Sequence, residues 1–345
     1  MNHMDIFNDD AFSLVNLVAQ INNMDHVPSR AGQLAFAGTG EGVPTLSVSI
    51  ESKAEVLSLI QTSPRGAPAP QEKQDKANIR NVHIPQIKLE DTIGAHQIQG
   101  VRQFGSTDVL RGAQSVVSGQ MQKMVRRHDM TLENHRLGAL RGVINDADGS
   151  ELLDLFDLFG VTAPADVPFH LDDFAADAYD DFIRATCAGI IRTMKRNLKM
   201  PWNNGIRVWA FCGDTFFDKL LEHPSFKEAY QATERAAAKL GDSYVHGVVE
   251  FGGIFFENYQ GTDDNTTVAV SATEARFFLT GVPGLYAEYF APADFMETAN
   301  TIGLPRYAKI APDAEFNRFV KLHTQQNPLP LCLRPKTLIR GTITA

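Results

Sequence analysis

The stretch TDVLRGAQSVVSGQMQKMVRRHDMTLENHRLGALRGVIND, residues 107–146, carries the clearest helical pattern in the chain. Its apolar residues recur mostly at steps of three or four, the spacing of one face of an α-helix. Thr107 and Asp108 can cap its start, and DADG (146–149) supplies a stop in which Gly149 is free to take a positive φ. About forty residues at about 1.5 Å each make a rod of roughly 60 Å. A round domain of this size cannot cover such a rod, so the sequence predicts an elongated molecule.

The region before this helix has the two-residue period of β-strands. The predicted strands span residues 46–50, 56–60, 79–84 and 87–93. Pro85 breaks the last pair and favours a bulge or an edge strand. Between the strands lies SPRGAPAPQEKQDKA (63–77), which has three prolines, mixed charge and no apolar periodicity. Because so long a structureless stretch is unusual inside a compact domain, we expect it to form the tip of a projecting arm.

The two ends of the chain differ in character. Residues 1–44 predict one short helix followed by an extended, loop-like arm. The remainder predicts mixed α and β structure. Its expected helices span residues 178–199, 214–221 and 225–239, and its expected strands span residues 206–213, 248–259, 274–280, 285–290, 329–333 and 337–343.

Composition excludes several classes of protein. The chain has 345 residues, of which 43% are hydrophobic and 21% charged, which is typical of a globular protein with two or three domains. The net charge of −9 has the wrong sign for a protein whose main task is to bind phosphates, and no basic stripe with interleaved aromatics indicates a nucleic-acid-reading surface. No run approaches 18 apolar residues, so no membrane span is expected. The N-terminus carries acids where a secretory signal would carry Lys or Arg, which favours a cytoplasmic product.

Residues that could carry chemistry are better explained as structural. Cys187, Cys212 and Cys332 are an odd number at wide spacing, and we expect reduced thiols. A nucleophilic Cys212 would need a nearby His, which no local residue supplies. His128 and His135 are two helical turns apart, too far for a joint metal site without a third ligand. We therefore predict no catalytic residue, no metal site and no cofactor.

The acidic clusters are also better explained as solvated caps and turns. The pairs at 172–173, 180–181 and 263–264 are adjacent residues, which point apart on a helix or a strand. NDADGSELLDLF (145–156) is similar to a calcium loop, but Ile144 and Leu155 would stand at two ligand positions. The alternative that stays open is a cytoplasmic α/β enzyme of unknown reaction that uses Cys212 or these carboxylates.

The elongated shape itself points to assembly. Apolar residues of the arm need cover, because exposed aliphatic area costs about 25 cal/mol per Å². These residues are Leu57, Leu59, Ile60, Ile84, Ile87 and Leu89. Neighbouring copies of the chain can supply that cover, which indicates a self-assembling structural protein.

A family resemblance rests on several blocks of sequence. TLENHRLGALRGVINDADG (131–149) resembles the signature T-x-E-x-x-R-x-G-A-L-x-G-x-x-x-D-A-D-G of the phage lambda-type major capsid proteins. Four further blocks are similar to the same family's blocks, in the same order, so the resemblance covers nearly the whole chain. They are SPRG (63–66), VRQFG (101–105), YFAPADFMETANTIGLPRYAK (289–309) and NPLPLCLRPKTLIRGT (327–342). One small departure is QQN at 325–327, where Gln-Ser-Asn is expected.

The resemblance implies an α+β fold of the Hong Kong 97 type found in tailed-phage shells. That fold has an N-terminal arm, an extension loop (E-loop), a peripheral domain with a long spine helix, and an axial domain. The implied divisions are the arm at 1–44, the E-loop hairpin at 45–100, the peripheral domain at 101–165 with its spine helix at 107–146, the axial domain at 166–303, and strands returning to the peripheral domain at 304–345.

The resemblance also implies a function. The family forms pentamers and hexamers that close into an icosahedral procapsid around a separate scaffolding protein, in the host cytoplasm. The shell expands as double-stranded DNA is packaged, and it is joined by a portal and often by decoration protein. The implied location is the virion capsid, with DNA enclosed without sequence-specific binding and with no membrane partner. We expect Pro64, Arg65, Gly66, Phe104, Glu133 and Arg136 to lie at subunit interfaces. Arg65 is placed to meet an acidic patch on an adjacent subunit, and Arg136 lies close enough to Glu133 to pair with it.

Overall fold

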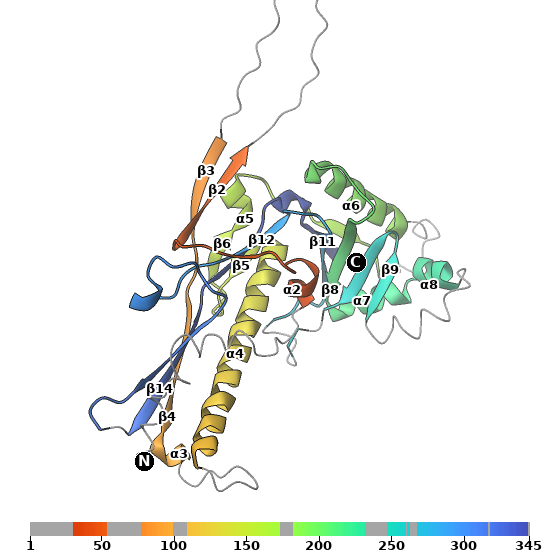
Figure 1. Cartoon of the computed structure of the whole chain (residues 1–345). Helices are drawn as coiled ribbons and strands as arrows, with labels where there is room; N and C mark the ends of the chain where they lie inside the picture. Colours follow the sequence, from red (N-terminus) through yellow and green to blue (C-terminus); the bar gives the residue numbers. More distant parts are fainter. Residues whose placement is uncertain are drawn as a thin grey trace, which may run out of the picture.

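A computed structural model describes residues 30–53, 77–98, 109–172, 182–231, 247–259, 261–262, 268–316 and 318–343. The chain is elongated and mixed α+β (Figure 1). Its longest element is helix α4, Val109–Arg141, which runs beside a narrow antiparallel sheet toward one end of the molecule. A broader sheet with helices lies to the other side of α4. The predicted strand at 56–60 and the predicted N-terminal helix lie outside the described residues, as does the arm tip up to residue 76.

Helix α4 ends earlier than the sequence predicts. Its last residue is Arg141, because Gly142 takes a φ of +92° and donates its N–H to the Gly138 carbonyl at 2.9 Å. Only a residue without a Cβ adopts that backbone conformation readily. The expected helical end is instead the hairpin of strands β5, Val143–Asn145, and β6, Glu151–Asp154. Gly149 does take a positive φ, in the turn of this hairpin.

The N-terminal half of α4 packs on a sheet of three antiparallel strands. In spatial order these are β13, Tyr307–Pro312, β14, Phe319–Gln326, and β4, Ile87–Gly94. One apolar face of each element meets in a small core that consists of Ile93, Val117, Met121, Met124, Val125, Ala308, Val320 and Leu322. Each large aliphatic side chain buried here contributes about 1.5 to 3 kcal/mol. This small core fixes the N-terminal half of α4 against the three-stranded sheet.

The broad sheet has six strands in the order β7-β16-β11-β8-β10-β9. They span Val167–Phe169 (β7), Arg207–Cys212 (β8), Val248–Phe251 (β9), Ile254–Asn258 (β10), Glu274–Thr280 (β11) and Ile339–Ile343 (β16). Helices α6, Phe182–Leu198, α7, Asp214–Glu222, and α8, Pro224–Gln231, accompany it. The sequence pattern anticipates most of these elements, but the expected strand at 248–259 is two strands, because Gly252 and Gly253 both take positive φ between them.

A third small sheet connects the two sides of the molecule. It contains β1, Gly40–Gly42, β12, Tyr286–Phe290, and β15, Pro328–Cys332. The antiparallel hairpin of β2, Ser47–Lys53, and β3, Ala77–His83, stands at one end of the molecule (Figure 1). Short helices complete the fold: α2, Arg30–Leu34, α3, Ala95–Ile98, α5, Leu155–Phe159, η4, Met296–Thr298, and η5, Pro335–Thr337.

Three elements differ from their sequence-based interpretation. Helix α2 lies in the stretch expected to be an extended arm, because its Ala31 is fully buried against the core. Strand β16 lies in the six-stranded sheet, paired with β11 and β7, although its residues were expected to return to the peripheral domain with α4. Strand β12 falls in the range assigned to the axial domain but pairs with β1 and β15, and β15 packs on α4. The pairings of these strands do not decide the domain divisions, which stay a prediction.

Pro85 lies where the chain changes sheets. Strand β3 pairs with β2 and ends at His83, and strand β4 begins at Ile87 and pairs with β14. Because proline lacks an N–H, it cannot continue a strand ladder through this position. Among the described residues β4 pairs on one side only, as expected for an edge strand.

Gly142 provides a test of how α4 ends. A Cβ at Gly142 would lie 2.2 Å from the Phe156 ring, and its φ is strained for any other residue. We expect Gly142→Ala to lower the free energy of unfolding by about 1 to 3 kcal/mol, measured by chemical denaturation. The control is Gly119→Ala within α4, where a Cβ would meet nothing within 4 Å. That variant is expected to be stabilised by up to about 1 kcal/mol; equal effects of the two substitutions would contradict this account.

Candidate functional site

Arg136 forms the central buried ion pair of the molecule. It projects from α4 onto Glu288 of β12, with Nε donating to Oε1 at 2.7 Å and Nη2 donating to Oε2 at 2.8 Å. The two side chains are 9% and 3% exposed. Two parallel charge-assisted hydrogen bonds fix both the distance and the orientation of the partners. The pair therefore sets the position of α4 against the small sheet that contains β12.

Glu133, almost one helical turn before Arg136, joins two further elements to α4. Its Oε1 accepts the Ala31 N–H at the start of α2 at 2.9 Å and the Tyr259 hydroxyl just after β10 at 2.8 Å. Burial raises the pKa of Tyr259, and the charge of Glu133 raises it further, so the phenol stays a donor at neutral pH. One carboxylate thus ties the helix to the N-terminal segment and to the broad sheet.

Arg30 adds a second tie between α2 and the broad sheet. Its guanidinium binds Glu257 of β10 in a bidentate manner, at 2.5 Å from Nε and 2.9 Å from Nη2, and lies 5.5 Å from the centre of the Trp209 ring. Burial raises the pKa of Glu257, and the hydrogen bond and charge of Arg30 oppose that effect.

The middle of α4 carries another polar cluster. Asp129 pairs with Arg306, and His128 Nε2 lies 2.9 Å from Thr324 Oγ1 of β14. Burial, with the charge of Arg306 as a smaller cause, lowers the pKa of His128 to about 4. The imidazole is neutral at pH 7, so it acts as a packed hydrogen-bonding group, as expected from its spacing to His135.

The residues predicted to lie at interfaces divide into two groups. Pro64, Arg65, Gly66 and Phe104 lie outside the described residues. Glu133 and Arg136 are 7% and 8% exposed within one chain and bind the partners described above. The role of all six residues at subunit contacts stays a prediction.

Glu288, the ion-pair partner of Arg136, is not among the residues predicted from the sequence. The signal was present: β12 reads YAEYF, with Tyr286, Glu288 and Phe290 on its inward face. A lone acid at an inward position of a short apolar strand indicates a buried cationic partner.

The groups considered for catalysis have structural environments. Cys212 is fully buried on β8, and burial raises the pKa of its thiol well above its ordinary value, which disfavours the reactive thiolate. Asp172 accepts a hydrogen bond from Lys219 Nζ at 2.7 Å, and the other residues of the adjacent acid pairs lie outside the described residues. Among the described residues no group of three His, Cys, Asp or Glu side chains is placed to hold a metal ion. None of the described helices is long and apolar enough to span a membrane.

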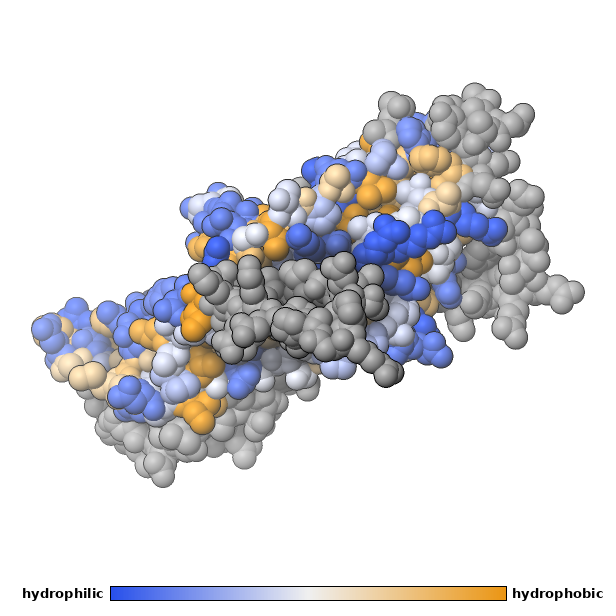
Figure 2. Space-filling model, turned by 90° about the horizontal axis from the view of Figure 1, so that it is seen from above, coloured by the Kyte–Doolittle hydropathy of each residue, from blue (hydrophilic) through white to orange (hydrophobic). Residues whose placement is uncertain are grey.

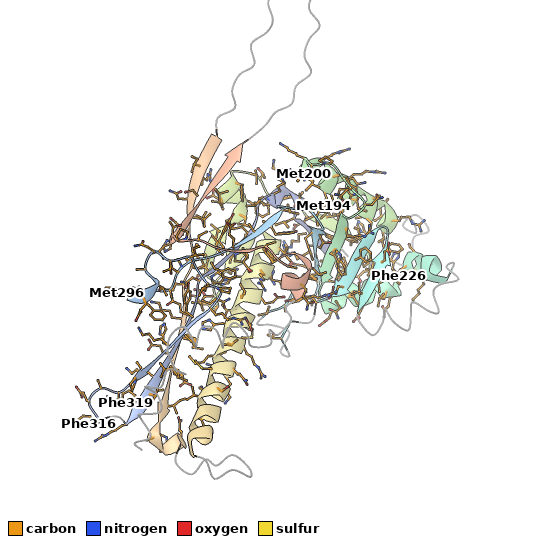
Figure 3. All side chains as sticks on the ribbon, viewed as in Figure 1. Met194, Met200, Phe226, Met296, Phe316 and Phe319 are labelled. Carbon is orange, nitrogen blue, oxygen red and sulfur yellow. The ribbon has the colours of Figure 1, made fainter. Side chains whose placement is uncertain are left out.

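Several large apolar side chains are exposed near the extremities of the described chain. They are Leu46 and Ile79 on the hairpin, Met296, Ile302 and Leu304 on the loop between β12 and β13, and Phe316 beyond β13. Figure 3 shows Met296 and Phe316 projecting away from the body, and Figure 2 shows apolar patches scattered between hydrophilic side chains. The arm residues expected to need outside cover behave differently: Ile84 is buried, Ile87 and Leu89 are half-buried, and Leu57, Leu59 and Ile60 lie outside the described residues.

Comparison with known proteins assigns this architecture. Residues 13–343 match the family model described as phage major capsid protein E. The chain belongs to the phage major capsid protein E family. The match covers nearly the whole chain and confirms the resemblance that the sequence blocks carry. The chain is thus a tailed-phage major capsid protein with a structural role, and its place is the virion capsid.

Relatives and solved structures agree with this family. The major capsid protein of Salmonella phage Felix O1 is 23% identical over 364 residues, covering 95% of each chain. That of Pseudomonas phage KPP10 is 24% identical over 316 residues, covering 86% of this chain and 87% of the relative. The putative capsid protein of a prophage of E. coli CFT073 superposes with a TM-score of 0.60 at 14% identity, covering 96% and 99% of the two chains. The capsid of cyanophage A-1(L) gives 0.53 at 10% identity, covering 94% and 95%. The fold of this capsid protein is the Hong Kong 97 type, as predicted.

The buried pair provides the main stability test. We expect Glu288→Gln to cost about 3 to 5 kcal/mol, because it leaves the charge of Arg136 buried without its counterion. The control is Glu297→Gln, which removes an acid from the exposed Lys309–Glu297 pair of the same capsid protein. Surface pairs contribute little, so the control's denaturation midpoint is expected to stay at the wild-type value. Equal losses in the two variants, measured by chemical denaturation of the subunit, would refute the importance of the Arg136–Glu288 pair.

Proposed function

We propose that this chain assembles with copies of itself into pentamers and hexamers of an icosahedral shell that encloses double-stranded phage DNA. Membership of the phage major capsid protein E family is the observation that carries the proposal. The fold supports it, since similar chains form the mature capsid of bacteriophage PhiM1, at a TM-score of 0.52 and 14% identity, and the capsid of phage XM1, at 0.51 and 9% identity.

The distribution of apolar side chains supports self-association. The centre of the subunit is fixed by buried ion pairs, whereas Met296, Ile302 and Phe316 are 94%, 67% and 67% exposed at its periphery. Large apolar side chains exposed together on one loop, as Met296, Ile302 and Leu304 are between β12 and β13, are typical of surfaces that another protein covers. Neighbouring copies in a closed shell cover such surfaces without any further partner.

The proposal includes partners and a place of assembly. Scaffolding protein supplied by a separate chain guides a procapsid in the host cytoplasm, a portal occupies one vertex, and decoration protein reinforces the shell after it expands. The subunit has no enzymatic activity in this scheme, and the packaged DNA is enclosed without sequence-specific recognition. The raised pKa of Cys212 and its full burial support the structural role over the alternative of an enzyme.

Microscopy of the expressed chain tests the proposal. The chain is produced with its scaffolding protein and examined by negative-stain microscopy and sedimentation. Closed shells or ring-shaped capsomers are the expected result. A small stable oligomer under all assembly conditions would contradict it.

A deletion tests the role of the arm. Removal of residues 63–76 leaves strands β2 and β3 intact, because they end at Lys53 and begin at Ala77. We expect a subunit with wild-type thermal stability and at least a tenfold lower yield of sedimenting shells. Arg65→Ala is expected to lower the yield in the same direction, and Lys321→Ala, which removes an exposed cation from β14, is the control. Normal shells from the deletion variant would remove the assembly role assigned to the arm.

A further inference from the structure

Helix α6 presents a basic surface in a chain that is acidic as a whole. Its sequence, FIRATCAGIIRTMKRNL, contains no Asp or Glu, although the chain carries a net charge of −9. Five exposed cations lie on the helix or directly after it. They are Arg184, Arg192, Lys195, Arg196 and Lys199, here called the α6 basic face.

The four cations within α6 share one side of the helix, and Lys199, whose φ is +50°, directly follows its end. At 3.6 residues per turn the four fall within about 120° of its circumference and extend about 18 Å along it. The opposite side is apolar and fully used by the subunit: Ile183, Cys187, Ile190, Met194 and Leu198 are each at most 2% exposed. Met194 is labelled in Figure 3, and Figure 1 shows α6 at the margin of the broad sheet.

The cations of this face are not neutralised by the part of the chain that the structure describes. None of the five forms a salt bridge with another described residue, and Lys195 instead lies 4.7 Å from the centre of the Trp202 ring. Some exposed cations elsewhere do have acidic partners, as Lys88 has in Asp294 and Lys309 has in Glu297. Like charges on one helix face repel, so an anionic partner would relieve an unfavourable term.

The side chains of the α6 basic face indicate which class of partner it binds. Protein interfaces have apolar or aromatic centres, in which Arg is enriched and Lys is depleted, whereas no large apolar side chain within α6 is exposed. A membrane-binding basic helix needs an exposed apolar face, and that of α6 is buried in the subunit. What remains is a row of exposed cations. Such a row suits the regularly spaced phosphates of a duplex, which are bound through charge and release of counterions.

We propose that the α6 basic face binds the phosphate backbone of double-stranded DNA without reading its sequence. This inference rests on the proposed shell function and adds a location: the helix would face the packaged genome and hold its outer layer. The negative net charge of the chain disfavours binding of DNA to the subunit as a whole, so contact is expected where cations cluster. Sequence analysis finds no nucleic-acid-reading surface, and none is needed, since the proposed contact carries no base recognition.

The test measures binding of the full-length subunit to a fluorescent 20-base-pair duplex of mixed sequence by anisotropy, over a range of salt concentrations. Each phosphate contact contributes about −0.9 to the slope of log K against log salt, so five contacts predict a slope of about −4 to −5. The variant R192Q/K195Q/R196Q is expected to reduce the slope to about −2 and to weaken binding at least tenfold in low salt.

The matched control is K88Q/K309Q/K321Q, which removes the same charge from the three-stranded sheet. It is expected to bind within twofold of wild type. Equal losses in the two triple variants would show that net charge alone acts, and would overturn the proposal. Absence of binding by the wild type would overturn it, as would displacement of the duplex by poly-glutamate at equal charge concentration.

Shell formation is scored separately by microscopy of the same variants. The α6 triple variant is expected to form shells as wild type does, because its substituted side chains are exposed and make no described ion pair. Wild-type shells together with wild-type DNA binding by this variant would reject the inference and leave the proposed function intact. Failure of the wild type to form shells would reject the proposed function instead.

Discussion

The bidentate pair between Arg136 and Glu288 is the interaction on which the rest of the structure depends. Removing two charges from water is costly, and the cost is recovered only when both hydrogen bonds form with good geometry. A sliding of α4 by one turn, about 5.4 Å, would bury both charges apart. The pair therefore selects one register of the helix against β12, and through β12 against the whole small sheet. We expect this pair to contribute more to a unique arrangement of α4 than a well-packed apolar pair would.

From that fixed register the other contacts of α4 follow. Glu133, on the same half of the helix, faces the start of α2 and the end of β10, and the Arg30–Glu257 pair closes the same junction. On the other half, Val117, Met121 and Met124 meet the three-stranded sheet in a separate, small core. Because α4 is long and the core beside it is small, the ends of the elongated subunit lie far from the main core. The exposed apolar side chains there belong to a subunit whose surroundings are other subunits.

Much of the fold could be predicted from sequence because its signals are local. The helical period of α4, the alternation in β4 and the apolar runs of β8 and β11 each reflect one element and the face it buries. The end of α4 could not be placed, because Gly142 and the DADG turn both carry stop signals and only the packing of Phe156 on Gly142 decides between them. Helix α2 has little periodicity of its own, and the hydrogen bond from the Ala31 N–H to Glu133 is a long-range contact that no local pattern indicates. Strand β16 has an ordinary strand pattern, and its sheet is set by pairing partners far away in sequence.

In the candidate site, too, the local features were predictable from the sequence and the contacts between distant residues were not. Sequence singled out Glu133 and Arg136 from their family blocks, and it paired them with each other because they are neighbours on a helix. Their partners in the structure, Tyr259 and Glu288, are more than 100 positions away, and no local pattern relates them. The α6 basic face was present in the sequence as spaced cations, but its meaning depends on which side of the helix is buried. That knowledge comes from the sheet against which the helix packs.

Amide hydrogen exchange of the unassembled subunit tests most directly whether the Arg136–Glu288 register is the fixed point of the molecule. Amides in residues 132–141 of α4 are expected to exchange together with those of β12 and β15, only through global unfolding, and more slowly than amides in residues 116–125. Faster exchange in 132–141 than in 116–125, or protection of 132–141 that is independent of β12, would contradict the account.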